Sequence, residues 1–148
     1  MNSCATYDDV NLILRLYELR REEKLRQARE WFVKSFHVSS LDELNALCPV
    51  GSENNAYYRM VISYWDMVAS FVANGVPQAE LFFESNRELL LVWERVRAVI
   101  PAVRESYKDP KVFHNIETVA ELYIEWLKKR GPGVYEAFAA RMSAKPAR

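Results

Sequence analysis

One carboxylate in the middle of an apolar segment has the residue type and the position that could support chemistry. Between Glu53 and Glu80 the only charged residues are Arg59 and Asp66. The rest of that segment is rich in aromatic and aliphatic residues, which is typical of a helix buried on all sides. A carboxylate in such a helix must be paired, protonated or bound to a ligand, because burying an unpaired charge is costly. Asp66 is therefore the first candidate for a functional residue.

Two further charged residues are candidates to meet Asp66. Arg104 and Glu117 lie on the two predicted helices that follow the central one, and a guanidinium can bind two carboxylates through its fixed fork of donors. We expect the three residues to form a buried or half-buried ion pair or triad. The preferred interpretation is that this network only fixes the register of the helices. The alternative is a small-ligand sensor or enzyme that uses them, with Tyr64, in a pocket.

Other catalytic or metal-binding patterns have little support. His37 and His114 lack the glutamate three residues earlier that di-iron sites of helical bundles use, and no glycine-rich phosphate loop is present. Cys48 could act as a nucleophile with His37 as its base. However, Cys48 closes a predicted short helix just before Pro49, where a packed thiol is the preferred interpretation. We expect no metal, no cofactor and no catalytic residue, which favours a protein that is not an enzyme.

The elements that must position these residues are helices, because apolar residues repeat at spacings of three and four. No segment shows strand alternation. The sequence predicts an all-α fold, a single-domain bundle of five to six helices over residues 1–148, in which residues 1–7 and 144–148 fray. The predicted helices are a long first helix from Asp8 or Asp9 to Phe36, a short helix after Ser40, a buried apolar central helix ending at Asn74, a segment from Pro77 to Val103 kinked at Pro101, a helix from Asp109 to Gly131 and a last helix from Val134 to Ser143.

The composition is that of an ordinary soluble domain, with 50% hydrophobic and 27% charged residues. The first residues lack the basic and apolar regions of a secretory signal. The longest uncharged stretch, Met67 to Ala79, is too short to cross a bilayer. Two cysteines are fewer than a small disulfide scaffold would use, so we expect free thiols and a cytoplasmic location.

The first half of the first predicted helix has more apolar residues than one buried face requires. One stripe includes Val10 and Tyr17 and continues along the whole helix, whereas a second stripe is confined to the first half. A surplus apolar stripe can face another part of the same chain or a second copy of it. We therefore expect a protein-binding or regulatory module that forms a homodimer. Core packing is the preferred use of Trp31, and the alternative is an exposed anchor for a protein partner. The second stripe consists of Leu12, Leu16 and Leu19.

The net charge is zero, but basic residues gather near the end of the chain. Residues 126–148 hold six of the 20 Lys and Arg residues and, in Glu136, one of the 20 acidic residues. A basic tail could bind nucleic acid or an anionic membrane surface. We prefer the interpretation that Lys128 and Lys129 complement the negative end of a helix dipole. Neither a nucleic acid nor a membrane is an expected partner.

Scattered residues between Tyr57 and Leu122 form a pattern that resembles a known family. The pattern consists of Asp66, Gly75, Trp93, Pro101, Arg104, the turn from Tyr107 to Pro110, Asn115, Ile116 and Glu117. It resembles a bacterial helical family classified as domain of unknown function 4760. The resemblance implies that Trp93 belongs to one structural kernel with Asp66, Arg104 and Glu117. It implies no reaction, because the family has none assigned.

Overall fold

The structure of the chain, a computed structural model, describes residues 4–143 and has nine helices in that range. They are α1 (Tyr7–Arg20), α2 (Glu23–Ser35), α3 (Leu41–Leu47), α4 (Glu53–Ala73), α5 (Ala79–Ser85), α6 (Arg87–Val96), α7 (Ile100–Tyr107), α8 (His114–Arg130) and α9 (Val134–Ser143). The predicted all-α class is confirmed, and the described residues contain no strand. The predicted number of five to six helices is wrong, because two of the predicted helices are broken.

The predicted long first helix is two helices that meet at Arg21 and Glu22. The carboxylate of Glu22 accepts a hydrogen bond from the Leu25 amide at 2.9 Å, so Glu22 is the N-cap of a new helix. This hydrogen bond also lowers the pKa of Glu22. Because the helix is interrupted here, the direction that the side chains of α1 face is not fixed by the direction that those of α2 face. The apolar stripe that lies on α2 therefore does not continue into α1.

The predicted segment from Pro77 to Val103 is three helices. Buried Asn86 separates α5 from α6, because its side-chain amide donates to the Phe82 carbonyl at 3.0 Å. A continuous helix would use that carbonyl for the backbone amide of Asn86. Further along, Pro101 has no amide hydrogen to donate to the Arg97 carbonyl. The predicted kink at Pro101 is therefore a break between α6 and α7.

The helix predicted to start at Asp109 begins at His114. The Asp109 carboxylate accepts a hydrogen bond from the Lys111 amide at 2.8 Å, so it closes a turn instead of capping a helix. Lys108 and Phe113 on either side of this turn have φ angles of 54°, in the left-handed region. Such a conformation is rare for residues with large side chains. The loop between α7 and α8 is therefore locally strained.

The ends of the chain agree with the sequence in part. Thr6 and Asp9 form a capping box that starts α1 at Tyr7. The predicted fraying is therefore wrong for Thr6 and Tyr7. Residues 1–3 and 144–148 lie outside the described residues. The predicted helix end at Gly131 and the predicted last helix are confirmed.

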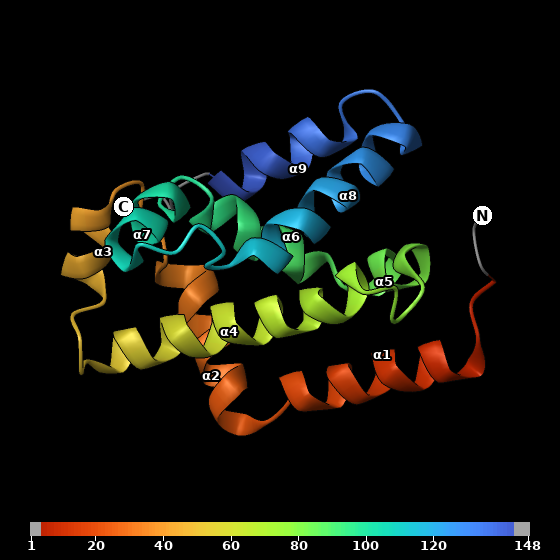
Figure 1. Cartoon of the computed structure of the whole chain (residues 1–148), viewed down its shortest axis with the longest axis horizontal. Helices are drawn as coiled ribbons and strands as arrows, with labels where there is room; N and C mark the ends of the chain where they lie inside the picture. Colours follow the sequence, from red (N-terminus) through yellow and green to blue (C-terminus); the bar gives the residue numbers. More distant parts are fainter. Residues whose placement is uncertain (1–3, 144–148) are drawn as a thin grey trace.

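The predicted central helix is confirmed as α4, which runs through the middle of the fold (Figure 1). It packs against α2 on one side and α8 on the other, and α9 covers α6 and α8. In Figure 1, α1 lies along the lower edge of the molecule, below α4. No helix in residues 4–143 is long and apolar enough to cross a bilayer.

The expectation that α4 is buried on all sides is wrong. Arg59, Ser63 and Met67 are exposed at a spacing of four residues, and Asp66 beside them is half-buried. The rest of α4 contributes to one continuous apolar core that reaches from Leu16 in α1 to Phe138 in α9. A narrow surface stripe thus runs along a helix that is otherwise internal.

Candidate functional site

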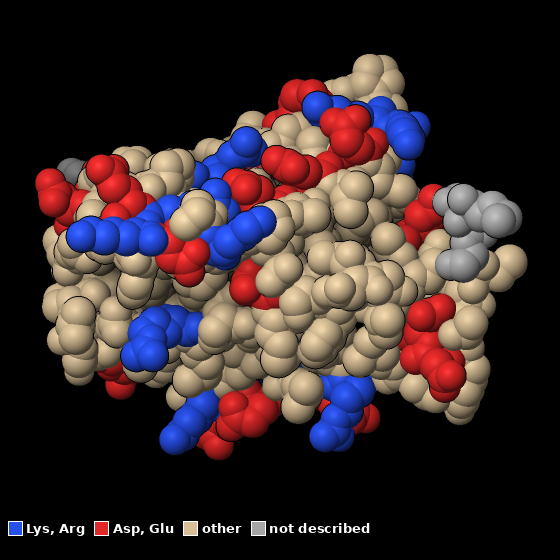
Figure 2. Space-filling view, viewed as in Figure 1, with Lys and Arg blue, Asp and Glu red and all other residues tan. Residues whose placement is uncertain are grey.

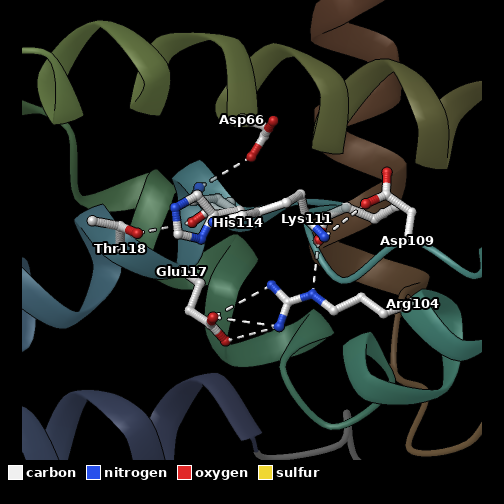
Figure 3. A network of polar contacts seen from close by, with 9 residues as sticks. Asp66, Arg104, Asp109, Lys111, His114, Glu117 and Thr118 are labelled. Atoms are coloured by element: carbon white, nitrogen blue, oxygen red, sulfur yellow. Dashed lines mark hydrogen bonds and ion pairs between the residues drawn. The ribbon is translucent and has the colours of Figure 1, made fainter.

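The carboxylate of Asp66 binds the first turn of α8 instead of a cation. Its Oδ1 atom accepts a hydrogen bond from the Ile116 backbone amide at 3.0 Å. Figure 3 shows the side chain pointing from α4 toward the start of α8. Ile116 is the third residue of that helix, and Phe113 at the N-cap position supplies no side-chain hydrogen bond. Asp66 therefore caps α8 from another helix, where the positive end of the helix dipole favours a carboxylate.

Arg104 forms its ion pair with Glu117 alone among the described residues. The guanidinium donates to both carboxylate oxygens at 3.3 to 3.4 Å, and its Nε donates to the Val112 carbonyl at 2.9 Å (Figure 3). The predicted triad with Asp66 is therefore wrong. Since α8 begins at His114, the Ile116 amide is one of the free amides of a first turn, and this amide satisfies Asp66.

This polar network ties three helices and a loop together. Asp66 joins α4 to α8, and Arg104 joins α7 to α8 and to the loop carbonyl of Val112. The left-handed Phe113 lies between these two attachments and packs against the core. A backbone conformation of that kind persists only when its surroundings hold it. The geometry thus supports the interpretation that the network is structural.

The other predicted members of the kernel lie elsewhere. Tyr64 is buried and donates from its hydroxyl to the Leu16 carbonyl in α1 at 2.7 Å, and burial raises its pKa to about 12. Trp93 is buried on α6 with the Arg97 guanidinium 5.8 Å from its ring centre. Trp31 is half-buried and its ring lies 5.9 Å from that of Tyr57. Each of these aromatic residues is used for packing.

A stronger ion pair, absent from the sequence prediction, connects α2 with α6. Arg29 donates to both carboxylate oxygens of Glu88 at 2.7 Å, and the Trp65 indole adds a third hydrogen bond at 3.2 Å. The side chains of Arg29 and Glu88 are only 24% and 17% exposed. The hydrogen bonds to Glu88 raise the pKa of Arg29. Two parallel hydrogen bonds of this kind are the strong form of an arginine–carboxylate pair.

Arg20 completes this second network without an ion pair of its own among the described residues. Only 8% of Arg20 is exposed, and its guanidinium lies 5.3 Å from the ring centres of both Tyr17 and Trp65. Burial lowers its pKa, although an arginine stays charged. Arg20 and Arg29 lie in a run of charged residues from Arg20 to Glu30, and such a run is typical of a solvated helix surface. Two of those charges are instead packed inward beside Trp65.

The predicted interface residues of α1 are partly inside the molecule. Leu16 is 2% exposed and belongs to the core, so it cannot contact a second copy. Leu19 borders a groove of about 460 Å³ between α1 and α4, together with Met60 and Met67. Leu12 borders another groove of about 370 Å³ beside Phe71. The prediction that these leucines form one exposed stripe is therefore wrong.

The expectation that the stripe with Val10 and Tyr17 continues along one helix is wrong, and the apolar side of α1 that contains these two residues faces solvent. It carries four residues at spacings of three, four and three, and we call them the α1 face. The break at Glu22 explains the error, because α1 is rotated independently of the stripe on α2. The four residues and their exposed fractions are Tyr7 at 78%, Val10 at 39%, Leu14 at 54% and Tyr17 at 48%.

The thiols and imidazoles do not assemble into a reactive site. Cys48 is buried, and desolvation raises the pKa of its thiol to about 11, which keeps it protonated. Cys4 is exposed, and both cysteines are free. In residues 4–143 no group of three or more His, Cys, Asp or Glu side chains could hold a metal ion.

The basic residues near the end of α8 are engaged with neighbouring side chains. Lys128 pairs with Glu125 at 3.4 Å, and Arg130 lies 4.9 Å from the ring centre of Trp126. Figure 2 shows acidic side chains among the basic ones on the viewed face. Lys145 and Arg148 of the predicted basic tail lie outside the described residues.

Comparison with known proteins identifies a family but no relative of known activity. A search of curated proteins and a search of solved structures each return no match. A family model described as a domain of unknown function, DUF4760, matches residues 5–138. This match extends well beyond the stretch from Tyr57 to Leu122 that carries the resemblance in the sequence. The chain therefore belongs to the DUF4760 family.

Proposed function

We propose that this chain is a non-enzymatic protein-binding module that self-associates through the α1 face. The observation that carries the proposal is the exposed apolar stripe formed by Tyr7, Val10, Leu14 and Tyr17. Contiguous exposed apolar residues on a folded domain mark interaction sites. Their spacing is that of the contact positions of paired helices.

The packing of α1 supports the same proposal. Of its 14 residues, only Leu16 and Arg20 are buried. A helix held by so few buried side chains leaves most of its circumference free for another protein. Arg15 and Glu18 beside the α1 face pair with each other at 4.0 Å, and the Arg21 guanidinium lies 5.7 Å from the ring centre of Tyr17 at one end of the face.

The polar network around Asp66 supports a structural role more than a ligand site. Its carboxylate is used by the Ile116 amide, and the Arg104 guanidinium is used by Glu117 and Val112. No observation favours the alternative of a sensor or enzyme. The alternative of a polyanion-binding tail likewise gains no support, since Lys128 is already paired. The free thiols agree with a cytoplasmic location, which is part of the proposal.

Sedimentation velocity across a concentration series tests the proposal, with Leu14→Glu as the disruptive variant. Leu14 is half-exposed, and burying its apolar surface in the dimer would contribute about 1 kcal/mol in each copy. Losing both contributions should weaken the dimer by about thirtyfold. Val50→Glu is the matched control, because Val50 is 98% exposed and distant from α1 in the chain. The proposal fails if the unchanged protein is a monomer at high micromolar concentration, or if both variants behave alike.

A further inference from the structure

We infer that the two copies pair through antiparallel α1 helices, with Val10 of one copy against Leu14 of the other. This inference rests on the proposed function, because it specifies how the α1 face is covered. It names the occupant as a second copy of this chain and fixes which residues meet.

The symmetry of the α1 face supports the antiparallel arrangement. Tyr7 and Tyr17 are each five residues from Leu12, and Val10 and Leu14 are each two residues from it. A two-fold axis that crosses the α1 face at the level of Leu12 along the helix therefore places Val10 against Leu14 and Tyr7 against Tyr17 of the second copy. Every exposed apolar residue of the stripe then contacts another one. A two-fold axis uses the same patch on both copies, as a closed dimer requires.

The charges of α1 distinguish this arrangement from a parallel one. The first turn is acidic, with Asp8 and Asp9, and the other end carries the exposed Arg21, since Arg20 is buried. Antiparallel helices bring the acidic end of one copy toward the basic end of the other. Parallel helices would place Arg21 beside Arg21, because it lies four residues after Tyr17 and is the next position of the same stripe. Like charges at that position oppose association.

The place of α1 in the fold leaves room for the second copy. In Figure 1 no other helix lies beyond α1 at the lower edge of the molecule, and Figure 2 shows charged side chains of both signs along that edge. A helix of 14 residues is about 21 Å long. One such contact is smaller than a standard interface, so the dimer should be weak and best detected by trapping.

Disulfide trapping with two proteins that each carry one accessible cysteine tests the arrangement. Both carry Cys4→Ser to remove the exposed thiol, and Cys48 is buried and stays silent. One protein adds Val10→Cys and the other adds Leu14→Cys. Under mild oxidation the antiparallel pair should give a cross-linked dimer when the two are mixed and little when each is alone. Parallel helices would give the reverse, because each position would then face its own copy.

A charge reversal provides a second measurement that needs no cysteine. Arg21→Glu should weaken an antiparallel dimer several-fold, since it places acidic groups at both ends, and Asp8→Lys in the same chain should restore it. A parallel dimer would instead be little changed by Arg21→Glu, because one like-charge pair would replace another at the same position. If Leu14→Glu abolishes the dimer while trapping or charge reversal follows the parallel pattern, this inference is wrong and the proposed function stands. A protein that is monomeric throughout overturns both.

Discussion

Replacing Glu88 by glutamine should destabilise the fold more than any change to a surface ion pair. The Glu88 carboxylate accepts two hydrogen bonds from Arg29 at 2.7 Å and one from the Trp65 indole at 3.2 Å. The amide of glutamine has the same shape but only one acceptor oxygen and no charge. Arg29 would then be a mostly buried cation without a counterion, close to the cation of Arg20.

The magnitude follows from the burial of the pair. Breaking a fully buried ion pair costs about 3 to 5 kcal/mol, whereas an exposed pair contributes about 0 to 1 kcal/mol. Side-chain exposures of 24% for Arg29 and 17% for Glu88 place this pair near the lower end of the buried range. We expect Glu88→Gln to cost about 3 kcal/mol, which corresponds to a fall in Tm of about 10 °C for a domain of this size.

Urea denaturation followed by tryptophan fluorescence measures this loss, with Glu30→Gln as the matched control. Glu30 pairs with Lys34 at 2.6 Å, but these side chains are 63% and 70% exposed. The control should therefore leave the free energy of unfolding nearly unchanged, because solvent screens an exposed pair. A Glu88→Gln protein within about 1 kcal/mol of the unchanged protein would refute the reasoning, because it would show that solvent screens the pair.

Three further predictions concern Asp66, Arg104 and the thiols. Asp66→Ala should cost about 1 to 2 kcal/mol in urea denaturation, the range for a lost helix cap, and a cost above 3 kcal/mol would instead indicate a broken buried ion pair. In double-mutant cycles Arg104 should couple more strongly to Glu117 than to Asp66, and the opposite order would contradict the geometry. In the native protein a thiol reagent should modify Cys4 rapidly and Cys48 only after unfolding, because burial raises the pKa of the Cys48 thiol to about 11. Equal rates of modification at the two cysteines would show that Cys48 is not buried.

The central helix was predictable because its signals are local. Ser52 caps its start and Gly75, with a φ of 84°, follows its end, and both are residue types that sequence analysis recognises. The breaks at Glu22 and Asn86 gave no such signal. Each depends on a side chain that takes over a backbone hydrogen bond, and either residue is also common inside helices. The number of helices was therefore wrong while their general course was right.

The site was predictable only as far as its residue types allowed. Asp66 stood out because a carboxylate in an apolar segment needs a partner, and the structure supplies one. The partner is the backbone amide of Ile116, and every residue type except proline carries such an amide, so the sequence could not single it out. Arg104 and Glu117 were expected to meet because opposite charges on packed helices are visible as residue types, but the expectation wrongly joined Asp66 to them. Arg29 and Glu88 were missed because each lies next to buried residues in a segment rich in charge.

The cap that Asp66 places on α8 links the order of folding events to the chain's topology. Fifty residues separate Asp66 from Ile116, and Phe113 supplies no side-chain cap near the helix start. The first turn of α8 can therefore be completed only after a long loop has closed and α4 has arrived. Closing such a loop costs entropy before the contact returns any free energy. A peptide covering α8 alone should begin to unwind at its N-terminal end, and in the whole protein the loss of Asp66 should act mainly on whichever kinetic step brings α4 and α8 together.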